Sequence, residues 1–111
     1  MSIFRLDAVE HGVIDSRYIQ SVDITITNAG PDPFDVLIHG YNPYGVYYVS
    51  LTHVGVGATV VIPEVANHNL SFSLLLVTNI NYSHSTVITV QAKNQGQLVA
   101  VFSNPNFSII E

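Results

Sequence analysis

The chain has no cysteine and no tryptophan, and only 10% of its 111 residues carry a formal charge. The absence of cysteine excludes disulfides, thiolate nucleophiles and zinc sites built on cysteine. Its three cations, Arg5, Arg17 and Lys93, leave a formal net charge of -5. Because no basic patch is available for phosphate groups, we do not expect nucleic-acid binding.

Long apolar runs are also absent, so no segment is predicted to span a membrane. The first residues lack the basic start and apolar core of a secretory signal. If the chain works at an extracellular or surface location, we therefore expect it to arrive there without an N-terminal signal peptide.

The charges that are present are distributed unevenly. Five of them fall within the first 20 residues, at Arg5, Asp7, Glu10, Asp15 and Arg17. Between Val36 and Ile110 the only charged residues are Glu64 and Lys93. Soluble β proteins normally carry charges on their exposed strands, because an uncharged sheet edge pairs readily with another chain. The pattern predicts sheet edges that are occupied by other copies of the chain.

Most of the sequence alternates between strand-forming residues and turn residues. Val22, Ile24 and Ile26 alternate with polar residues, as in a half-buried strand. Further strands are predicted at residues 34–39, 46–54, 59–62, 70–76, 86–92, 98–102 and 107–110. No segment has helical periodicity. About eight short strands predict an all-β, two-sheet antiparallel sandwich, and the lack of a cysteine pair and of tryptophan favours a jelly-roll-like fold over an Ig-like one.

Residues 1–20 precede this pattern, and we predict that they form an extended N-terminal arm ahead of a β-sandwich domain at 21–111. The arm offers apolar anchors for a neighbouring subunit at Ile3, Phe4, Leu6, Val13, Ile14, Tyr18 and Ile19. An extended segment of this kind can add a strand to the sheet of another copy. The residues predicted to face outward from the sandwich are Thr25, Thr27, Ser50, Thr52, Ser71, Ser73, Thr86 and Gln91.

Candidate chemical sites are weak. The five histidines, at positions 11, 39, 53, 68 and 84, lack the short spacings of metal ligands, so we expect no metal and no cofactor. Residues 55–57 (Gly-Val-Gly) precede a strand and not a helix, which favours a turn over a nucleotide site. Residues 83–85 (Ser-His-Ser) have no neighbouring acid to orient the histidine, and we do not expect an enzyme.

Four tyrosines cluster around one turn, at Tyr41, Tyr44, Tyr47 and Tyr48. Tyrosine combines a rigid apolar ring with one polar group, which suits both subunit interfaces and sugar-stacking platforms. A carbohydrate-binding module is therefore an alternative function. A viral or phage coat or tail protein is another, because it shares the fold and the assembly.

Three segments resemble the small β-sandwich subunits of bacterial endospore appendages. They are Ser21-Val-Asp-Ile-Thr-Ile-Thr-Asn28, Leu70-Ser-Phe-Ser73 and Gln95-Gly-Gln-Leu-Val-Ala-Val-Phe102. The resemblance implies a jelly-roll body and an N-terminal connector that enters neighbouring subunits, here at residues 1–20. Subunits of those spore fibres use cysteines near the connector, and this chain has none. Together these features predict a structural subunit that self-assembles into a filament by arm insertion and edge-strand pairing.

Overall fold

Nine β-strands follow one another in the computed structural model, which describes residues 1–110. They are β1 (Ser2–Ala8), β2 (Ser21–Asn28), β3 (Phe34–Asn42), β4 (Gly45–Val54), β5 (Thr59–Ala66), β6 (Phe72–Thr78), β7 (Thr86–Asn94), β8 (Gln97–Ser103) and β9 (Ser108–Ile110). Three single-turn 3-10 segments lie between them: η1 (Ser16–Tyr18), η2 (Ser83–Ser85) and η3 (Asn104–Asn106). Residues 1–110 contain no α-helix.

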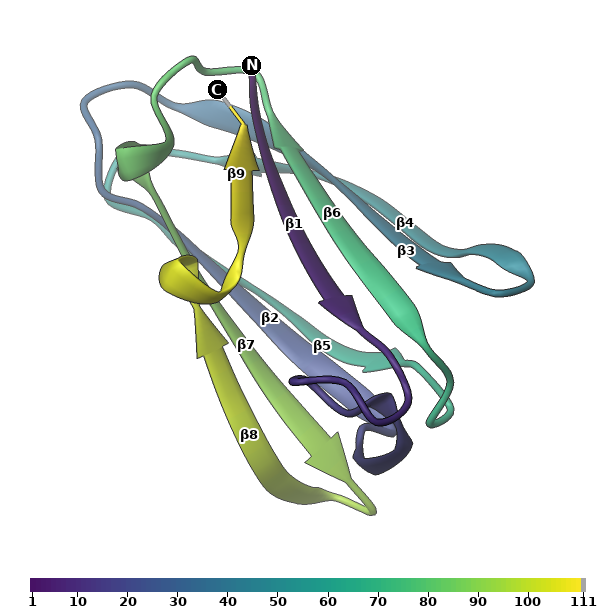
Figure 1. Ribbon diagram of the computed structural model, residues 1–111. Helices are drawn as coiled ribbons and strands as arrows, with labels where there is room; N and C mark the ends of the chain where they lie inside the picture. Colours follow the sequence, from purple (N-terminus) through teal and green to yellow (C-terminus); the bar gives the residue numbers. More distant parts are fainter. Residues whose placement is uncertain (111) are drawn as a thin grey trace.

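The strands form two antiparallel sheets that pack face to face (Figure 1). One sheet has five strands in the order β4-β3-β6-β1-β9, and the other has four in the order β5-β2-β7-β8. Within residues 1–110, β3–β4 and β7–β8 are the only consecutive strands that share a sheet. The other connections cross between the sheets. The predicted all-β antiparallel sandwich is confirmed.

The core lies between the sheets, because apolar residues at every second position of each central strand point inward. Five strands each contribute three buried apolar side chains: Phe4, Leu6 and Ala8; Val22, Ile24 and Ile26; Phe34, Val36 and Ile38; Phe72, Leu74 and Leu76; and Ile88, Val90 and Ala92. Burial of one large aliphatic side chain contributes about 1.5–3 kcal/mol. This period-2 pattern fixes the register, since a one-residue slip would turn the apolar side chains to solvent.

The turn between β7 and β8 is a two-residue hairpin loop. Gln95 and Gly96 both have positive φ, at 52° and 79°. A type I′ turn requires this geometry at both central positions, and its twist matches that of the flanking strands. The chain therefore forms a tight hairpin turn between the paired residues Asn94 and Gln97.

Candidate self-assembly surfaces

The two sheets have four edge strands within residues 1–110, and two of these edges are protected. β9 is only three residues long and covers β1 from Ile3 to Arg5. β5 contains Pro63 and Glu64, and the pairing of β2 with β5 shifts register at this point. Glu64 has a φ of 58°, and its N–H donates to the carboxylate of Asp23 at 2.8 Å. Proline, charge and a bulge are the features that discourage a further strand from pairing.

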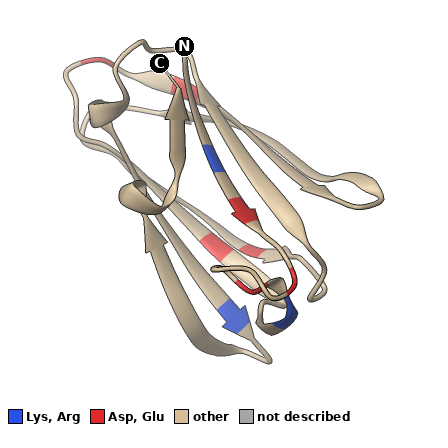
Figure 2. Cartoon of the chain, viewed as in Figure 1, with Lys and Arg blue, Asp and Glu red and all other residues tan. Residues whose placement is uncertain are grey.

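The other two edges, β4 and β8, carry neither proline nor charge, although each contains one extra residue, Tyr47 in β4 and Val99 in β8, where its pairing shifts register. β4 is ten residues long and β8 is seven, and neither contains Lys, Arg, Asp, Glu or Pro. In Figure 2 both strands are free of red and blue. A long uncharged edge presents unpaired N–H and C=O groups and is ready to pair with another strand.

These two edges lie at opposite margins of the sandwich. β4 ends the five-stranded sheet and contacts β5 of the other sheet, so β4 and β5 share one margin. β8 is at the far end of the sheet that β5 begins, and so it lies at the opposite margin. The molecule thus has one open edge on each side, and each belongs to a different sheet.

The predicted N-terminal arm is not confirmed. β1 pairs along its whole length with β6 and on its other side with β9, inside the five-stranded sheet. Phe4 and Leu6 are buried in the core of their own chain, and so is Ile19. Ile3 and Ile14 are half-buried, and Val13 and Tyr18 are exposed. The apolar residues expected to anchor a neighbour are therefore divided between the molecule's own core and its surface.

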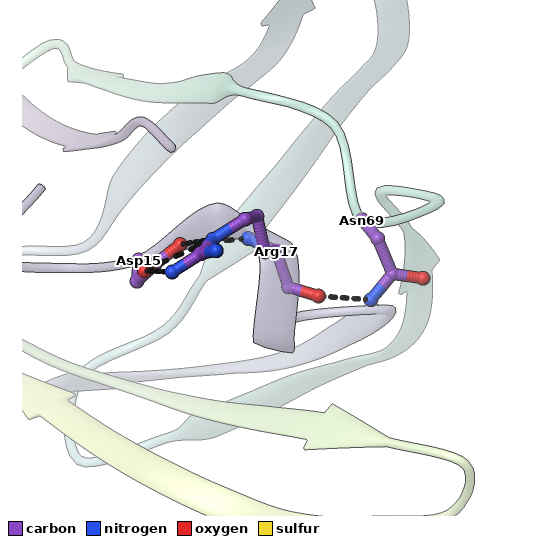
Figure 3. Close-up of polar contacts among 3 residues, drawn as sticks. All are labelled: Asp15, Arg17 and Asn69. Atoms are coloured by element: carbon purple, nitrogen blue, oxygen red, sulfur yellow. Dashed lines mark hydrogen bonds and ion pairs between the residues drawn. The ribbon is translucent and has the colours of Figure 1, made fainter. Parts of the chain in front are cut away.

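The segment that follows β1 is also fixed to the sandwich. Asp15 caps η1, accepting hydrogen bonds from the backbone N–H of Arg17 at 3.1 Å and from its guanidinium at 2.7 Å (Figure 3). The bonded Arg17 side chain holds the pKa of the Asp15 carboxyl far below its ordinary value. Asn69 donates from Nδ2 to the carbonyl of Arg17 at 2.9 Å, and Gln20 donates to the carbonyl of Lys93 at 2.8 Å.

Several of the predicted outward-facing residues are placed differently. Thr25, Thr27, Ser73 and Gln91 do lie on outer faces. Thr86 is fully buried because it is in phase with Ile88 and Val90 on the inner face of β7, and Ser71 lies just before β6. The register of β3 with β4 turns Ser50 and Thr52 toward the inner side, opposite Ile38 and Val36. The outer face of β4 carries Val49 and Leu51 instead.

The four tyrosines do not share one face. Tyr47 and Tyr48 pack against the core, whereas Tyr41 is on the outer face of β3 and Tyr44 is exposed in the β3–β4 turn. The hydroxyl of Tyr47 donates to Oδ1 of Asn67, and burial raises the pKa of Tyr47 to about 12. Tyr41 bonds instead to Nδ1 of His39 at 2.8 Å.

The remaining candidate sites are the histidines, the turn at residues 55–57 and the 3-10 segment at residues 83–85. In residues 1–110, no three side chains of His, Asp or Glu come together as a metal site. Gly55 accepts a hydrogen bond from Ala58 at 3.0 Å in the turn between β4 and β5. Residues 83–85 form η2, where Ser85 is buried. Within the described part of the chain, no helix has the length and apolar character to cross a membrane.

Comparisons with protein-family models, with curated proteins and with solved structures find no match to this chain. The geometry of its surfaces is thus what bears on its function.

Proposed function

We propose that this chain is a structural, non-enzymatic subunit that polymerises with copies of itself by edge-strand pairing. The observation that carries the proposal is the pair of long, uncharged edges, β4 and β8, at opposite margins of one sandwich. Pairing of β4 with β8 of the next copy would satisfy the open ladders of both strands. The resemblance to spore-fibre subunits supports an extracellular or surface location for such a polymer.

Because the two pairing edges differ, their contact is head-to-tail and leaves a free β4 at one end and a free β8 at the other. A head-to-tail contact that does not close into a ring builds a filament. The pairing would join the five-stranded sheet of one copy to the four-stranded sheet of the next. The common ladder extends over the seven residues of β8.

In this fold, insertion of the N-terminal segment into a neighbour would differ from the addition of a free arm. β1 already lies between β6 and β9 of its own chain. Its insertion into a neighbour would be an exchange of β1 between copies and would not add a free arm. Edge pairing needs no such rearrangement, since β4 and β8 are open in the folded monomer.

The test is to place charge on one edge. Lysines at two exposed positions of β8, Val99→Lys with Val101→Lys, should abolish filaments in negative-stain micrographs and in light scattering. The matched control, Val87→Lys with Thr89→Lys, puts the same charges two residues apart on the neighbouring strand β7, which has partners on both sides. The control should polymerise as the unmodified chain does.

The β8 variant also tests the polarity of the contact. Its β4 edge is intact, so it should bind the β8 end of a growing filament and stop growth at that end at substoichiometric amounts. Closed shells in the micrographs would indicate a coat-like assembly instead. Filaments that form equally well from the β8 variant, or an unmodified chain that stays monomeric at high concentration, would refute the proposal.

A further inference from the structure

The outer face of the five-stranded sheet carries a continuous row of aliphatic side chains, one from each strand. The register places Leu51 of β4 beside Leu37 of β3, and Leu37 beside Val77 of β6. Val77 is in turn beside Ile3 of β1, and Ile3 is beside Ile110 of β9. We call these five residues the aliphatic row. At its two ends, Leu51 is 72% exposed and Ile110 is 65% exposed.

The next row on the same face adds further apolar surface. Val49, 59% exposed, and Leu75 lie in register with His39 between them. Arg5 continues this second row on β1, and it forms an ion pair with Asp7 at 3.0 Å. On the other side of the aliphatic row, the Asp35 carboxylate contacts Nδ1 of His53 at 2.8 Å. The carboxylates and the guanidinium near the row thus each have a partner in their own chain.

The outer face of the other sheet is different, so the aliphatic row does not simply reflect an apolar composition. Its central row consists of Val61, Thr25, Thr89 and Ser103, of which three carry hydroxyl groups. An ion pair between Lys93 and Asp23 also lies on that face. Only one of the two outer faces thus presents a continuous aliphatic band across the residues that the structure describes.

We infer that the outer face of the five-stranded sheet binds the same face of a second copy, as an isologous contact that is separate from the β4 and β8 edges. The row crosses all five strands and Val77 is at its centre. A twofold axis that passes through Val77 and lies in the face, along β6 or along the row, superposes the aliphatic row of one copy on that of the other. The surface is thus complementary to itself without any rearrangement.

The size of the face is close to what such a contact needs. Four strands spaced by about 4.8 Å give a width of about 19 Å, and seven residues at about 3.3 Å each give a length of about 23 Å. β9 adds a strip only three residues long. The footprint is then about 490 Å² on each copy, or about 980 Å² in total, which is close to the lower limit of about 1,000 Å² for a specific interface. Aligned sheets that pack in this way form a dry layer of interdigitated side chains.

The face contact would allow filaments to associate laterally. Edge pairing extends a filament, whereas face pairing would join two filaments, or two free subunits, back to back. The face contact uses side chains and leaves the main-chain groups of β4 and β8 unoccupied. Face pairing can therefore be tested independently of the proposed edge pairing.

The absence of cysteine permits a direct cross-linking test. Val77→Cys introduces a single thiol at the centre of the row, and a short bismaleimide should convert most of the protein to a covalent dimer. Thr25→Cys is the matched control, because Thr25 is half-buried on the outer face of the central strand of the other sheet. Equal cross-linking of the two variants, or none for Val77→Cys, would overturn the inference.

A second experiment separates face pairing from edge pairing. In the background of Val99→Lys with Val101→Lys, where filaments are blocked, sedimentation velocity should still show a dimer. Adding Val77→Asp places two carboxylates against each other at the twofold axis and should weaken the dimer at least tenfold. Adding Thr25→Asp should leave it unchanged. A monomer with native circular dichroism in the edge-blocked background would rule out face pairing, whatever the outcome for filaments.

Discussion

The phenol ring of Tyr47 lies directly against the backbone of Gly40. A Cβ atom placed on Gly40 would be 2.7 Å from Cζ of Tyr47 and 3.0 Å from its hydroxyl oxygen. Gly40 is the position where the pairing of β3 with β4 shifts register, so the ring fills the space that the missing side chain leaves. The contact holds one of the two open edge strands, β4, against the sandwich.

Replacement of this glycine should therefore loosen β4. We expect Gly40→Ala to reduce the free energy of unfolding by about 1–3 kcal/mol, because the added methyl group must displace a packed ring. Gly55→Ala is the control, since a Cβ there meets no atom within 4 Å. Denaturant unfolding of the two variants measures the difference. Equal stability would show that the ring moves aside without cost.

The hydroxyl of Tyr47 gives a second prediction. It donates to Oδ1 of Asn67, which is only 2% exposed and whose Nδ2 has no hydrogen-bond partner among the described residues. Tyr47→Phe leaves that buried amide with still fewer partners and should cost about 1–3 kcal/mol. Tyr44→Phe, at a residue that is exposed in the β3–β4 turn, should have no effect on thermal unfolding.

The same residue predicts how stability changes at alkaline pH. Burial raises the pKa of Tyr47 to about 12 in the folded chain, against an ordinary value of 10.0. The unfolded chain therefore loses this proton first, and stability should fall as the pH rises from about 10 to about 12. Below pH 10 the contribution is complete. Urea unfolding measured across this range should show a shallower decline for Tyr47→Phe, and parallel declines would contradict the assignment.

The pair formed by Asp23 and Lys93 predicts an acid dependence. Lys93 Nζ is 2.5 Å from Asp23 Oδ2, and this contact, together with the N–H of Glu64, lowers the pKa of the Asp23 carboxyl. A lowered pKa means that stability is present above the unfolded value near 3.8 and is lost as the pH falls through the folded value.

Two substitutions separate the two partners of Asp23. Asp23→Asn should destabilise the chain at pH 7, and the difference from the unmodified protein should shrink below pH 4. Lys93→Gln removes the ammonium but keeps the hydrogen bond to the N–H of Glu64, so it should destabilise less. Thermal unfolding from pH 2 to pH 7 measures both. A pH-independent difference for Asp23→Asn would contradict the role given to its charge.

The central strands were predicted from their periodicity, whereas the first strand was predicted to be part of an arm. β2 and β7 were recognisable because their apolar residues alternate with Thr and Gln. β1 has the same alternation, with Phe4, Leu6 and Ala8 inward, but the residues between them are Arg5 and Asp7. These charged residues on the outer face led to the prediction that the segment is an arm. Alternation alone would have indicated a half-buried strand, because the identity of the outward residues does not change the inward face.

The rule that apolar residues face the core does not predict the orientation of β4. Its inner face carries Ser50 and Thr52, and its outer face carries Val49 and Leu51. An edge strand is only half covered by the opposing sheet, so its inner positions tolerate hydroxyl groups. The phase is set at its ends, where Val54 is buried beside Phe34 and Tyr47 packs on Gly40. The aliphatic row depends on strand order and register, which no local pattern in the sequence contains.

The placement of β1 leads to the last prediction, which concerns the N-terminal segment. If residues 1–20 were a free arm, their deletion would leave a folded sandwich that no longer polymerises. Because β1 lies between β6 and β9 and buries Phe4 completely, deletion should instead abolish cooperative unfolding of the remaining chain.

A single substitution also tests whether β1 belongs to the core, and it perturbs the chain less than the deletion does. Phe4→Ala should cost about 3–5 kcal/mol, a large part of the roughly 5–15 kcal/mol that stabilises a domain of this kind. Val13→Ala is the control from the same segment, since Val13 is fully exposed and should be replaceable without effect. Calorimetry on both variants and on the truncated chain decides between the two views. A truncated chain that still unfolds cooperatively would return residues 1–20 to the role of an arm, and exchange of β1 between subunits would then become the mechanism of assembly to test.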